Sequence, residues 1–368
     1  MSADNEKYII LTCYYRPKPG GFCKRLFRAI YALLDRGHTV HYLAVVPFPI
    51  DHPACHFHRF PWPANHTSGY LFWLFFHLIA PVQLFFLGCK YKVNRLFAFG
   101  YNYSLLMQPY RLTKKIPLTV FLRGDTKVNH RILGRPSLLI RFELFLEGLG
   151  IVGSRMYGVS ESLINNILAQ HRLLKPATSG VLRNDILEHS ALPIKNRKFE
   201  SPLRLACVGM LQPNKNQRFL LEIMRKINAK QAQLYLYGVG SDEDFLRESV
   251  EKGNMEDRVH FMGWVIAETI WPEIDLLLMP SLHEGAPNAL LEALGRAIPV
   301  LASDIPGHAE ILSPRDLFSV NQSQEWVKFL NQEGSTLKDA LIEITQRQSE
   351  SCKKLKFDWE NDFIKLVS

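Results

Sequence analysis

The sequence predicts two Rossmann-like α/β domains, each a doubly wound parallel sheet. The chain has 368 residues, more than one hydrophobic core ordinarily organises. Short apolar runs alternate with amphipathic stretches along most of its length, which is typical of βαβ units. A polar stretch at residues 188–202 divides these units into two series.

The first series begins with a buried strand. Residues 8–15 are apolar and lead into the loop 16–21, which contains two prolines and two glycines. Apolar side chains then recur at helical spacing over 22–36, and Gly37 ends this helix. Short apolar runs predict the remaining strands of this series at 39–45, 96–99, 118–122, 156–159 and 180–182.

The second series repeats this pattern from Leu203 onward. Its apolar runs predict strands at 203–208, 234–237, 259–262, 274–279 and 299–302. Amphipathic stretches predict helices at 219–227, 243–251 and 288–296. We therefore expect an N-terminal domain at 1–187, a linker at 188–202, a C-terminal domain at 203–345, and a helix at 346–368 that packs back on the N-terminal domain.

Composition narrows the class of partner. Lys and Arg number 44 against 35 Asp and Glu, and the formal net charge of +9 favours phosphate, nucleic acid or an acidic membrane. No Lys/Arg-rich run interleaved with aromatic residues is present, so we expect no nucleic-acid binding. The six cysteines are scattered without metal-type spacing. Residues 1–7 lack the pattern of a signal peptide, so we expect a cytoplasmic protein.

One stretch departs from the soluble pattern. Residues 69–88 contain seven aromatic side chains and no Asp, Glu, Lys or Arg. Three interpretations stay open: a buried helix, a surface that rests in the membrane interface beside Lys90, Lys92 and Arg95, and a membrane-spanning helix. The position inside a βα series argues against the span.

A second unusual stretch is rich in histidine. His52, His56, His58 and His66 cluster in what reads as a loop between prolines. They have neither cysteine partners nor helical i,i+4 spacing, so we expect no metal site there.

Residues 279–295 carry the clearest chemical signal. An apolar strand ends at Pro280, a loop carries Glu284, and a helix begins near Asn288, whose side chain can cap it. The unpaired N–H groups and positive dipole end of a helix start bind anions. Glu284 and Glu292 flank this start, and carboxylates accept hydrogen bonds from hydroxyls such as a ribose diol. Together these features predict a receptor for a nucleotide sugar.

The same residues carry a resemblance to a known family. The stretch 284–292, followed by Gly295, 299–300 and 303–310, resembles the signature of family 4 retaining glycosyltransferases. These are also described as glycosyl transferases group 1, and they have the two-Rossmann GT-B architecture. The similarity extends upstream to residues 208–211, 215–216, 237–240, 261–264 and Asp275. It covers the C-terminal half strongly and the N-terminal half weakly.

The resemblance implies a donor-binding C-terminal domain and an acceptor-side N-terminal domain that face each other across a cleft. Glu284 would hold hydroxyls of the donor sugar, Glu292 the ribose diol, and Lys215 the diphosphate whose charge grows as the sugar–phosphate bond breaks, which makes Glu284 and Lys215 the catalytic candidates. The other implied donor-binding residues are Gly20, Gly21, Gly209, Gly238, Trp264, Val265, Gly285, Ala286, Pro287, Asn288 and Ala289.

Two departures from the family pattern bear on the cleft. Met210 stands where the family commonly has Arg, so we expect Lys215 to neutralise more of the diphosphate charge, or Arg123 or Arg183 to substitute. No His follows the strand at 118–122, where Arg123 and Asp125 are instead the candidates for acceptor or cleft contacts.

The resemblance implies transfer of a sugar from a nucleoside diphosphate to a glycan or lipid-linked acceptor with retention of configuration, in the synthesis of a cell-surface polysaccharide or lipopolysaccharide. We expect no metal and no other cofactor, because no Asp-x-Asp lies in the expected place. We also expect the protein to contact the inner face of the cell membrane peripherally. A sugar-nucleotide epimerase on the same scaffold and a degenerate, non-catalytic homologue remain alternatives.

Overall fold

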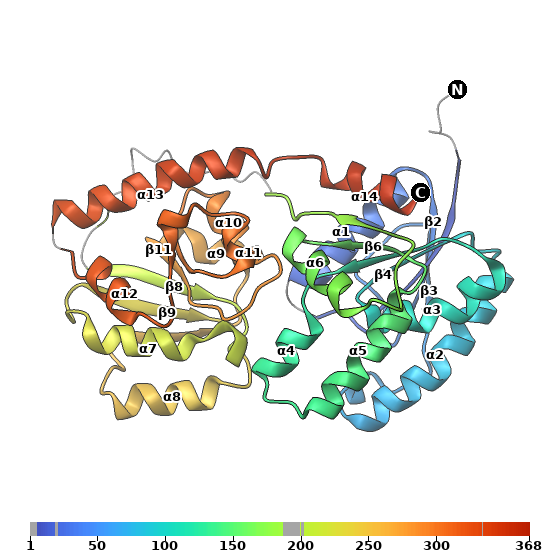
Figure 1. Cartoon of the computed structure of the whole chain (residues 1–368), viewed down its shortest axis with the longest axis horizontal. Coiled ribbons are helices and arrows are strands. Elements are labelled where there is room, and N and C mark those ends of the chain that lie inside the picture. Colours follow the sequence, from blue (N-terminus) through green and yellow to red (C-terminus); the bar gives the residue numbers. More distant parts are fainter. Residues whose placement is uncertain (1–5, 19–20, 187–198, 200–201, 333) are drawn as a thin grey trace. The chain divides into compact units, whose positions relative to one another are not determined.

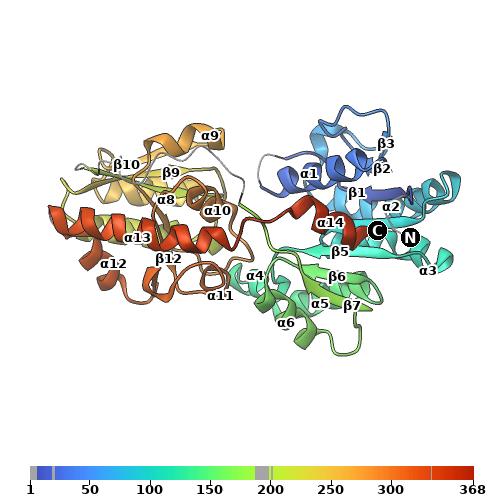
Figure 2. The same ribbon diagram turned by 90° about the horizontal axis from the view of Figure 1, so that it is seen from above.

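The computed structural model describes residues 6–18, 21–186, 199, 202–332 and 334–368. The predicted linker therefore lies outside the described residues except for 199 and 202. The chain divides into two compact units (Figures 1 and 2). Unit 1 comprises Met1–Thr126, Pro136–Arg183 and Asp358–Ser368, and unit 2 comprises Lys127–Arg135 and Asn184–Phe357.

Unit 1 is built on a seven-stranded sheet with the order β3-β2-β1-β4-β5-β6-β7, in which every pairing is parallel. Its order reverses between β1 and β4, the topological switch point at which α/β sheets bind ligands. The strands are β1 (Ile9–Cys13), β2 (Thr39–Ala44), β3 (Cys55–Arg59), β4 (Arg95–Phe99), β5 (Leu118–Leu122), β6 (Arg155–Gly158) and β7 (Thr178–Val181).

Helices cover both faces of this sheet, as right-handed crossovers require. Figure 1 shows α1 and α14 on one side and α2, α3 and α5 on the other. The helix α3 packs against both α2 and α5. The helices are α1 (Gly21–Asp35), η1 (Ala64–His66), α2 (Tyr70–Lys90), α3 (Tyr101–Lys114), α4 (Thr126–Ile132, mostly in unit 2), α5 (Ser137–Ile151), α6 (Glu161–Gln170) and α14 (Trp359–Val367).

The last helix, α14, docks on unit 1. Its Trp359 ring lies 5.1 Å from the Arg25 guanidinium of α1, and Arg28 of α1 forms an ion pair with Glu360. On the sheet side, Thr119 Oγ1 of β5 donates a hydrogen bond to the carbonyl of Leu366 (3.1 Å). The expected boundary at residue 346 falls inside a different helix, α13 (Ser335–Lys353), which belongs to unit 2.

Unit 2 repeats the architecture with a six-stranded parallel sheet in the order β10-β9-β8-β11-β12-β13, so its switch point lies between β8 and β11. The strands are β8 (Leu203–Val208), β9 (Ala232–Tyr237), β10 (Val259–Gly263), β11 (Leu276–Met279), β12 (Val300–Ser303) and β13 (Leu317–Phe318). The helices are η3 (Pro213–Lys215), α7 (Gln217–Lys226), α8 (Glu243–Lys252), α9 (Ala267–Ile270), η4 (Trp271–Glu273), α10 (Asn288–Leu294), α11 (Pro306–Ala309), η5 (Pro314–Asp316), α12 (Ser323–Leu330) and α13.

Alternate residues of β8 show how the core of unit 2 forms. Leu203, Leu205 and Cys207 belong to one buried apolar cluster, whereas Ala206 belongs to a second one. Because successive strand residues point to opposite faces, the two clusters lie on opposite sides of the sheet. All strands predicted from sequence are present, with ends that differ by two residues or fewer.

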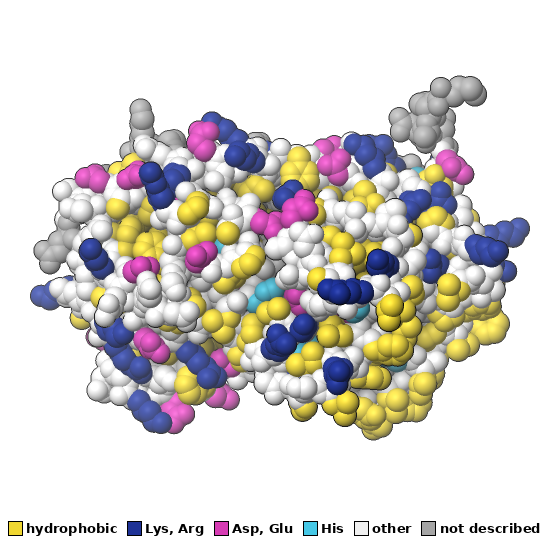
Figure 3. Space-filling model, viewed as in Figure 1, with side chains coloured by type: hydrophobic (Ala, Val, Ile, Leu, Met, Phe, Trp, Pro, Cys, Tyr) yellow, Lys and Arg dark blue, Asp and Glu magenta, His cyan; other side chains and the backbone are white. Residues whose placement is uncertain are grey.

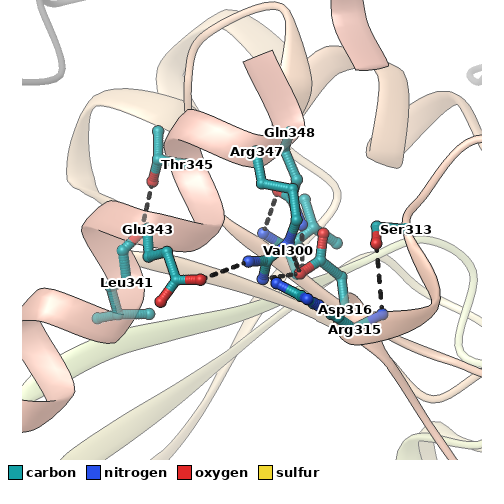
Figure 4. A network of polar contacts seen from close by, with 9 residues as sticks. All are labelled: Val300, Ser313, Arg315, Asp316, Leu341, Glu343, Thr345, Arg347 and Gln348. Atoms are coloured by element: carbon teal, nitrogen blue, oxygen red, sulfur yellow. Dashed lines mark hydrogen bonds and ion pairs between the residues drawn. The ribbon is translucent and has the colours of Figure 1, made fainter. Parts of the chain in front are cut away.

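The helix α13 is fixed to the sheet by a buried polar network (Figure 4). The Gln348 amide donates to the carbonyl of Val300 in β12 (2.7 Å) and accepts from its N–H (3.0 Å). In the preceding residue, Arg347, Nε donates to Asp316 Oδ1 (3.0 Å) and Nη1 donates to Glu343 Oε1 (2.9 Å). Asp316 is fully buried, so the Arg347 guanidinium supplies its compensating charge.

The prediction of a loop around His56 and His58 was wrong. Residues 55–59 form β3, an edge strand that pairs with β2 and places His41 opposite His56. The hydropathy pattern does not reveal this strand, because it lies at the edge of the sheet, pairs with β2 only, and carries mostly polar side chains. The His41 ring stacks on those of His56 (4.7 Å), His58 (5.2 Å) and Tyr91 (4.2 Å), and its Nδ1 is 2.9 Å from His58 Nε2.

We expect Arg347→Met to lower the free energy of unfolding by about 3 kcal/mol, because the buried Asp316 carboxylate loses its cation. Glu343→Gln is the matched control. The Glu343 side chain is 67% exposed, so its loss is expected to cost less than about 0.5 kcal/mol. Chemical denaturation of both variants measures the difference, and equal losses would contradict the assignment.

The histidine cluster makes unit 1 sensitive to acid. Burial, followed by the charges of His56 and His58, lowers the pKa of His41 to about 4, against an ordinary value near 6.5. Between these values only the unfolded chain binds the proton, so stability falls as the pH falls through this window. We expect a loss of roughly 1–2 kcal/mol between pH 7 and pH 5. Thermal unfolding should show this loss for the natural chain and for His66→Gln, and a reduced loss for His41→Gln.

Candidate functional site

The loops that follow β8 and β11 bring opposite charges together at the switch point of unit 2. Lys215 ends η3, which follows β8, and Glu284 lies in the loop between β11 and α10. Lys215 Nζ donates a hydrogen bond to Glu284 Oε1 and forms an ion pair with it. The Glu284 side chain is 9% exposed and that of Lys215 is 23% exposed. The pair thus lies at the carboxyl edge of the sheet, where α/β folds place their ligand sites.

Close backbone approach shapes the β8 side of the site. The Gly209 N–H donates to the carbonyl of Tyr237 (2.9 Å), and Leu211 N–H donates to that of Val239 (3.1 Å). Gly238 adopts φ +136°, and a Cβ there would collide with the carbonyl oxygen of Gly209. Only glycine allows the loops after β8 and β9 to lie this close.

Asparagines join the β8 loop to the β11 loop. Asn216 adopts a left-handed backbone (φ 55°), and its Nδ2 donates to the carbonyl of Pro280 (3.2 Å). The Leu282 N–H donates to the carbonyl of Asn214 (2.8 Å). These two contacts flank Lys215 and hold its loop against the loop that carries Glu284.

The end of β12 and the start of α11 pack against the loop that carries Glu284. Ser281 Oγ donates to Glu284 Oε1 (2.9 Å), and Ser303 Oγ donates to the carbonyl of Ser281 (2.5 Å). Gly307 lies so close to the Glu284 carbonyl that any Cβ would collide with it. The Glu284 carboxylate is therefore oriented by hydrogen bonding and by backbone packing together.

His308 packs behind Ser303, and its imidazole ring is neutral. It is fully buried, and burial is the main cause that lowers its pKa. Its Nδ1 lies 2.9 Å from the carbonyl of Ser303, so this nitrogen carries the hydrogen and donates it. Nε2 is buried without a hydrogen-bond partner among the described residues. The ring fixes the end of β12 and leaves the Lys215–Glu284 pair as the charged part of the site.

Glu292 is placed by a separate set of contacts on α10. Trp271 Nε1 donates to Glu292 Oε2 (3.3 Å), and Arg296 Nη1 donates to the Glu292 carbonyl (3.1 Å).

The prediction that Asn288 caps this helix was wrong. Pro287 occupies the cap position, and no side chain among the described residues caps the helix. Asn288 is the first residue of the helix itself, and its Oδ1 accepts a hydrogen bond from Asn184 Nδ2 (3.2 Å).

Apolar side chains border the same edge of the sheet. Met210, Val239, Trp264 and Ile266 follow β8, β9 and β10, and all four are exposed. Val265, between two of them, is partly buried and packs against the core. Exposed apolar side chains beside a charged pair suit a ligand with one flat apolar part and one anionic part.

The candidates of unit 1 lie at the carboxyl edge of its own sheet. Gly21 opens α1, and Gly20 lies outside the described residues. The Arg123 guanidinium lies 5.6 Å from the ring centre of Phe22, at the start of α1. Asp125 is 1% exposed and accepts a hydrogen bond from Gln170 Nε2 (3.1 Å), so it is no surface residue. Arg183 Nη2 lies 3.8 Å from Glu161 Oε1, which makes an ion pair at the start of α6.

Sequence reasoning missed a buried acid–base pair in unit 1. Glu147 of α5 accepts hydrogen bonds from Thr126 (2.6 Å), at the end of the loop that holds Asp125, and from His171 (2.8 Å). An acidic residue in an apolar helix is the signal that could have found it.

Among the residues that the structure describes, no group of three His, Cys, Asp or Glu side chains is arranged to hold a metal ion.

Comparison with known proteins supports the predicted resemblance. Residues 202–332 match the family model described as "Glycosyl transferases group 1", and this match includes Lys215, Glu284 and Glu292. Protein CapJ of Staphylococcus aureus is 31% identical over 103 residues, which are 27% of this chain and 26% of CapJ. The amylovoran biosynthesis glycosyltransferase AmsK of Erwinia amylovora is 30% identical over 175 residues, 43% of each chain. These alignments span between a quarter and a half of the relatives.

Solved structures share the fold over the whole chain. WaaG, a glycosyltransferase involved in lipopolysaccharide biosynthesis, matches with a TM-score of 0.71 and 20% identity, over 98% of this chain and 99% of that one. Anabaena HepE, solved in complex with UDP-glucose, matches with a TM-score of 0.69 and 15% identity over 98% of both chains. The expectation of two Rossmann-like domains is thereby confirmed.

A double-mutant cycle tests whether the Lys215–Glu284 pair fixes the site. Lys215→Met is expected to lower the free energy of unfolding by about 1–3 kcal/mol, because the largely buried Glu284 loses its donor. Adding Glu284→Gln should recover part of this loss and give a coupling energy of at least about 1 kcal/mol. Denaturant unfolding of the three variants measures it, and strictly additive losses would show that the pair is not coupled.

Proposed function

We propose that this chain transfers a sugar from a nucleoside-diphosphate sugar to a glycan or lipid-linked acceptor, with retention of configuration, in the synthesis of a cell-surface polysaccharide. The observation that carries the proposal is the Lys215–Glu284 pair at the switch point of unit 2, inside the segment that matches the glycosyltransferase family model. The pair offers one cation for a diphosphate and one carboxylate for sugar hydroxyls.

The diphosphate is proposed to lie beside Lys215 and the start of α10. The first N–H groups of a helix have no partner within it, and no described side chain caps α10. The backbone from Gly285 to Ala289 therefore supplies donors, and Lys215 adds a full positive charge. Because Met210 is uncharged, the proposal assigns the main neutralising role to Lys215.

The nucleoside is proposed to occupy the neighbouring edge, toward β9 and β10. Trp264 is 57% exposed and offers a flat ring on which a base can stack. Met210 and Val239, which are also exposed, directly follow Gly209 and Gly238, the two glycines at which the loops approach each other closely. Glu292, half-buried and held by Trp271, is proposed to accept hydrogen bonds from the ribose diol. The sugar would then reach Glu284.

The proposed reaction breaks the bond between the sugar's anomeric carbon and the diphosphate oxygen. The acceptor hydroxyl attacks the same face, and its proton passes to the departing diphosphate. Lys215 and the N–H groups of α10 stabilise the negative charge that develops there, which is where electrostatic catalysis acts. Glu284 orients the sugar through its hydroxyls. This scheme requires neither a protein base nor a metal, and we propose that no cofactor is used.

The names of similar proteins support the class of substrate. HepE was solved with UDP-glucose, and AmsK and WaaG are named for the biosynthesis of amylovoran and of lipopolysaccharide. We propose a nucleotide sugar and a surface glycan for this chain by the same logic, and a cytoplasmic location. Because a lipid-linked acceptor lies at a membrane surface, the proposal includes peripheral contact with an anionic membrane.

Donor binding and transfer test the proposal directly. We expect a uridine or guanosine diphosphate sugar to raise the melting temperature without added metal, since a ligand that binds only the folded state stabilises it. Glu284→Gln, which keeps the shape and removes the charge, should weaken donor binding roughly 10- to 100-fold. Glu248→Gln on the exposed face of α8 is the matched control and should bind normally.

Three results would overturn parts of this proposal. A melting shift that disappears with a chelator would refute metal independence. Release of an epimerised nucleotide sugar without acceptor would indicate an epimerase. No shift with any nucleotide sugar, together with unchanged glycan production in cells that carry Glu284→Gln, would indicate a non-catalytic homologue.

A further inference from the structure

The net excess of positive charge in this chain comes from one continuous segment. Residues 52–142 contain 12 Lys and Arg and a single acidic residue, Asp125. Asp125 is buried and accepts a hydrogen bond from Gln170, so it adds little negative charge to the surface. The formal charge of this segment, +11, exceeds that of the whole chain, +9. The rest of the chain therefore has no positive excess.

This segment includes α2, which is apolar on its outer side as well as its inner side. Phe72, Phe76, Ala80, Leu84 and Gly88 recur at intervals of four residues and are buried against unit 1. The opposite stripe is exposed to solvent. Its members are Tyr70, Leu71, Leu74, Phe75, Leu78, Ile79, Val82 and Phe86. Figure 3 shows hydrophobic side chains gathered over this helix, along the lower edge of unit 1. An exposed apolar stripe of this length marks an interaction surface.

The helix α5 contributes a second stripe on the same side of the sheet. Leu138, Phe142 and Phe145 are all more than half exposed and recur at helical spacing. The acidic residues of α5 point elsewhere: Glu143 accepts from Tyr101 (2.6 Å) and Glu147 is buried against Thr126 and His171. Since α3 packs against both α2 and α5, the two stripes belong to one side of unit 1.

Exposed basic residues border both stripes. Lys90 ends α2 and Lys92 follows it, while Arg141 lies within the α5 stripe. Arg59 lies beside the middle of α2, because the Gln83 side chain donates to its carbonyl (2.9 Å). Apolar side chains rimmed by Lys and Arg are the pattern of a helix that lies in the headgroup region of an anionic bilayer.

The packing of α2 decides between the three interpretations of this stretch. Only 28% of its apolar window is buried, so a buried core helix does not describe it. Gly88 packs against the Tyr110 ring, and the Tyr110 hydroxyl shares its single hydrogen between the carbonyls of Gly88 (2.8 Å) and Val93 (2.9 Å), just before β4. A spanning helix would have to break these contacts and pull β4 from the sheet, whereas a helix lying in the interface keeps them.

The geometry points to the outer stripes of α2 and α5, with Arg59, Lys90, Lys92 and Arg141, as a surface that docks on an anionic lipid bilayer with both helices lying in the headgroup region. This surface specifies the membrane contact in the proposed function, but it requires no sugar transfer. It is tested without donor or acceptor, so its failure and the failure of the proposed function are distinguishable.

Vesicle binding of the full chain tests this surface. We expect co-sedimentation with vesicles of phosphatidylcholine and phosphatidylglycerol, and much weaker binding to phosphatidylcholine alone. Leu71→Gln combined with Leu78→Gln should lower the partition coefficient at least about tenfold, because two exposed apolar side chains no longer enter the interface. Lys90→Gln and Arg141→Gln should each lower it about fivefold. Raising the salt concentration from about 0.1 M to about 1 M should weaken the charge contribution, as the Debye length shortens from about 10 Å to about 3 Å.

Matched controls lie on α1, on the opposite side of the same sheet. Tyr31→Gln and Lys24→Gln make the same kinds of change at exposed positions and should leave vesicle binding unchanged. Equal binding of the α2 double variant and the natural chain would overturn the inference, as would equal binding to both kinds of vesicle. So would a double variant that changes only self-association, measured by sedimentation, since the stripe would then be an interface between copies of this chain.

Discussion

The ion pair between Lys215 and Glu284 is the interaction on which the candidate site depends. Each side chain lies on a loop that leaves one of the two strands flanking the switch point of unit 2, so the pair joins loops that sheet topology alone would leave independent. Its geometry is set by neighbours that accept no substitution: Gly238 against Gly209, and Gly307 against the Glu284 backbone. A pair of opposite charges held this closely can separate to receive an anion on one side and hydroxyls on the other.

The sequence was informative wherever one local rule determined the structure. Apolar runs located the strands that have neighbours on both sides, because both faces of those strands are buried. They missed two edge strands, β3, whose residues are mostly polar, and β13, which has only two residues. The segment 279–295 identified Glu284 and Glu292 through their strand–loop–helix setting. The support from Ser303 and His308 could not be derived in this way, because it depends on β12 lying next to β11 in the sheet. The start of α10 at Asn288 was predicted correctly, but its cap was assigned to Asn288 instead of Pro287, since both residues suit a helix start.

The two units divide the chemistry between them. Unit 2 carries the paired charges, the helix start and the exposed apolar edge, all within the segment that resembles known glycosyltransferases. Unit 1 carries the excess of positive charge and the two exposed apolar stripes. The proposed transfer from a water-soluble anionic donor to an acceptor at a membrane would use both kinds of surface, and the two surfaces lie in different units.

A structure of the chain bound to a nucleoside-diphosphate sugar tests the central claim most directly. The account predicts the diphosphate beside Lys215 and the N–H groups of α10, with sugar hydroxyls donating to Glu284 and the ribose diol donating to Glu292. A ligand bound elsewhere, or one that leaves both carboxylates without a contact, would contradict it.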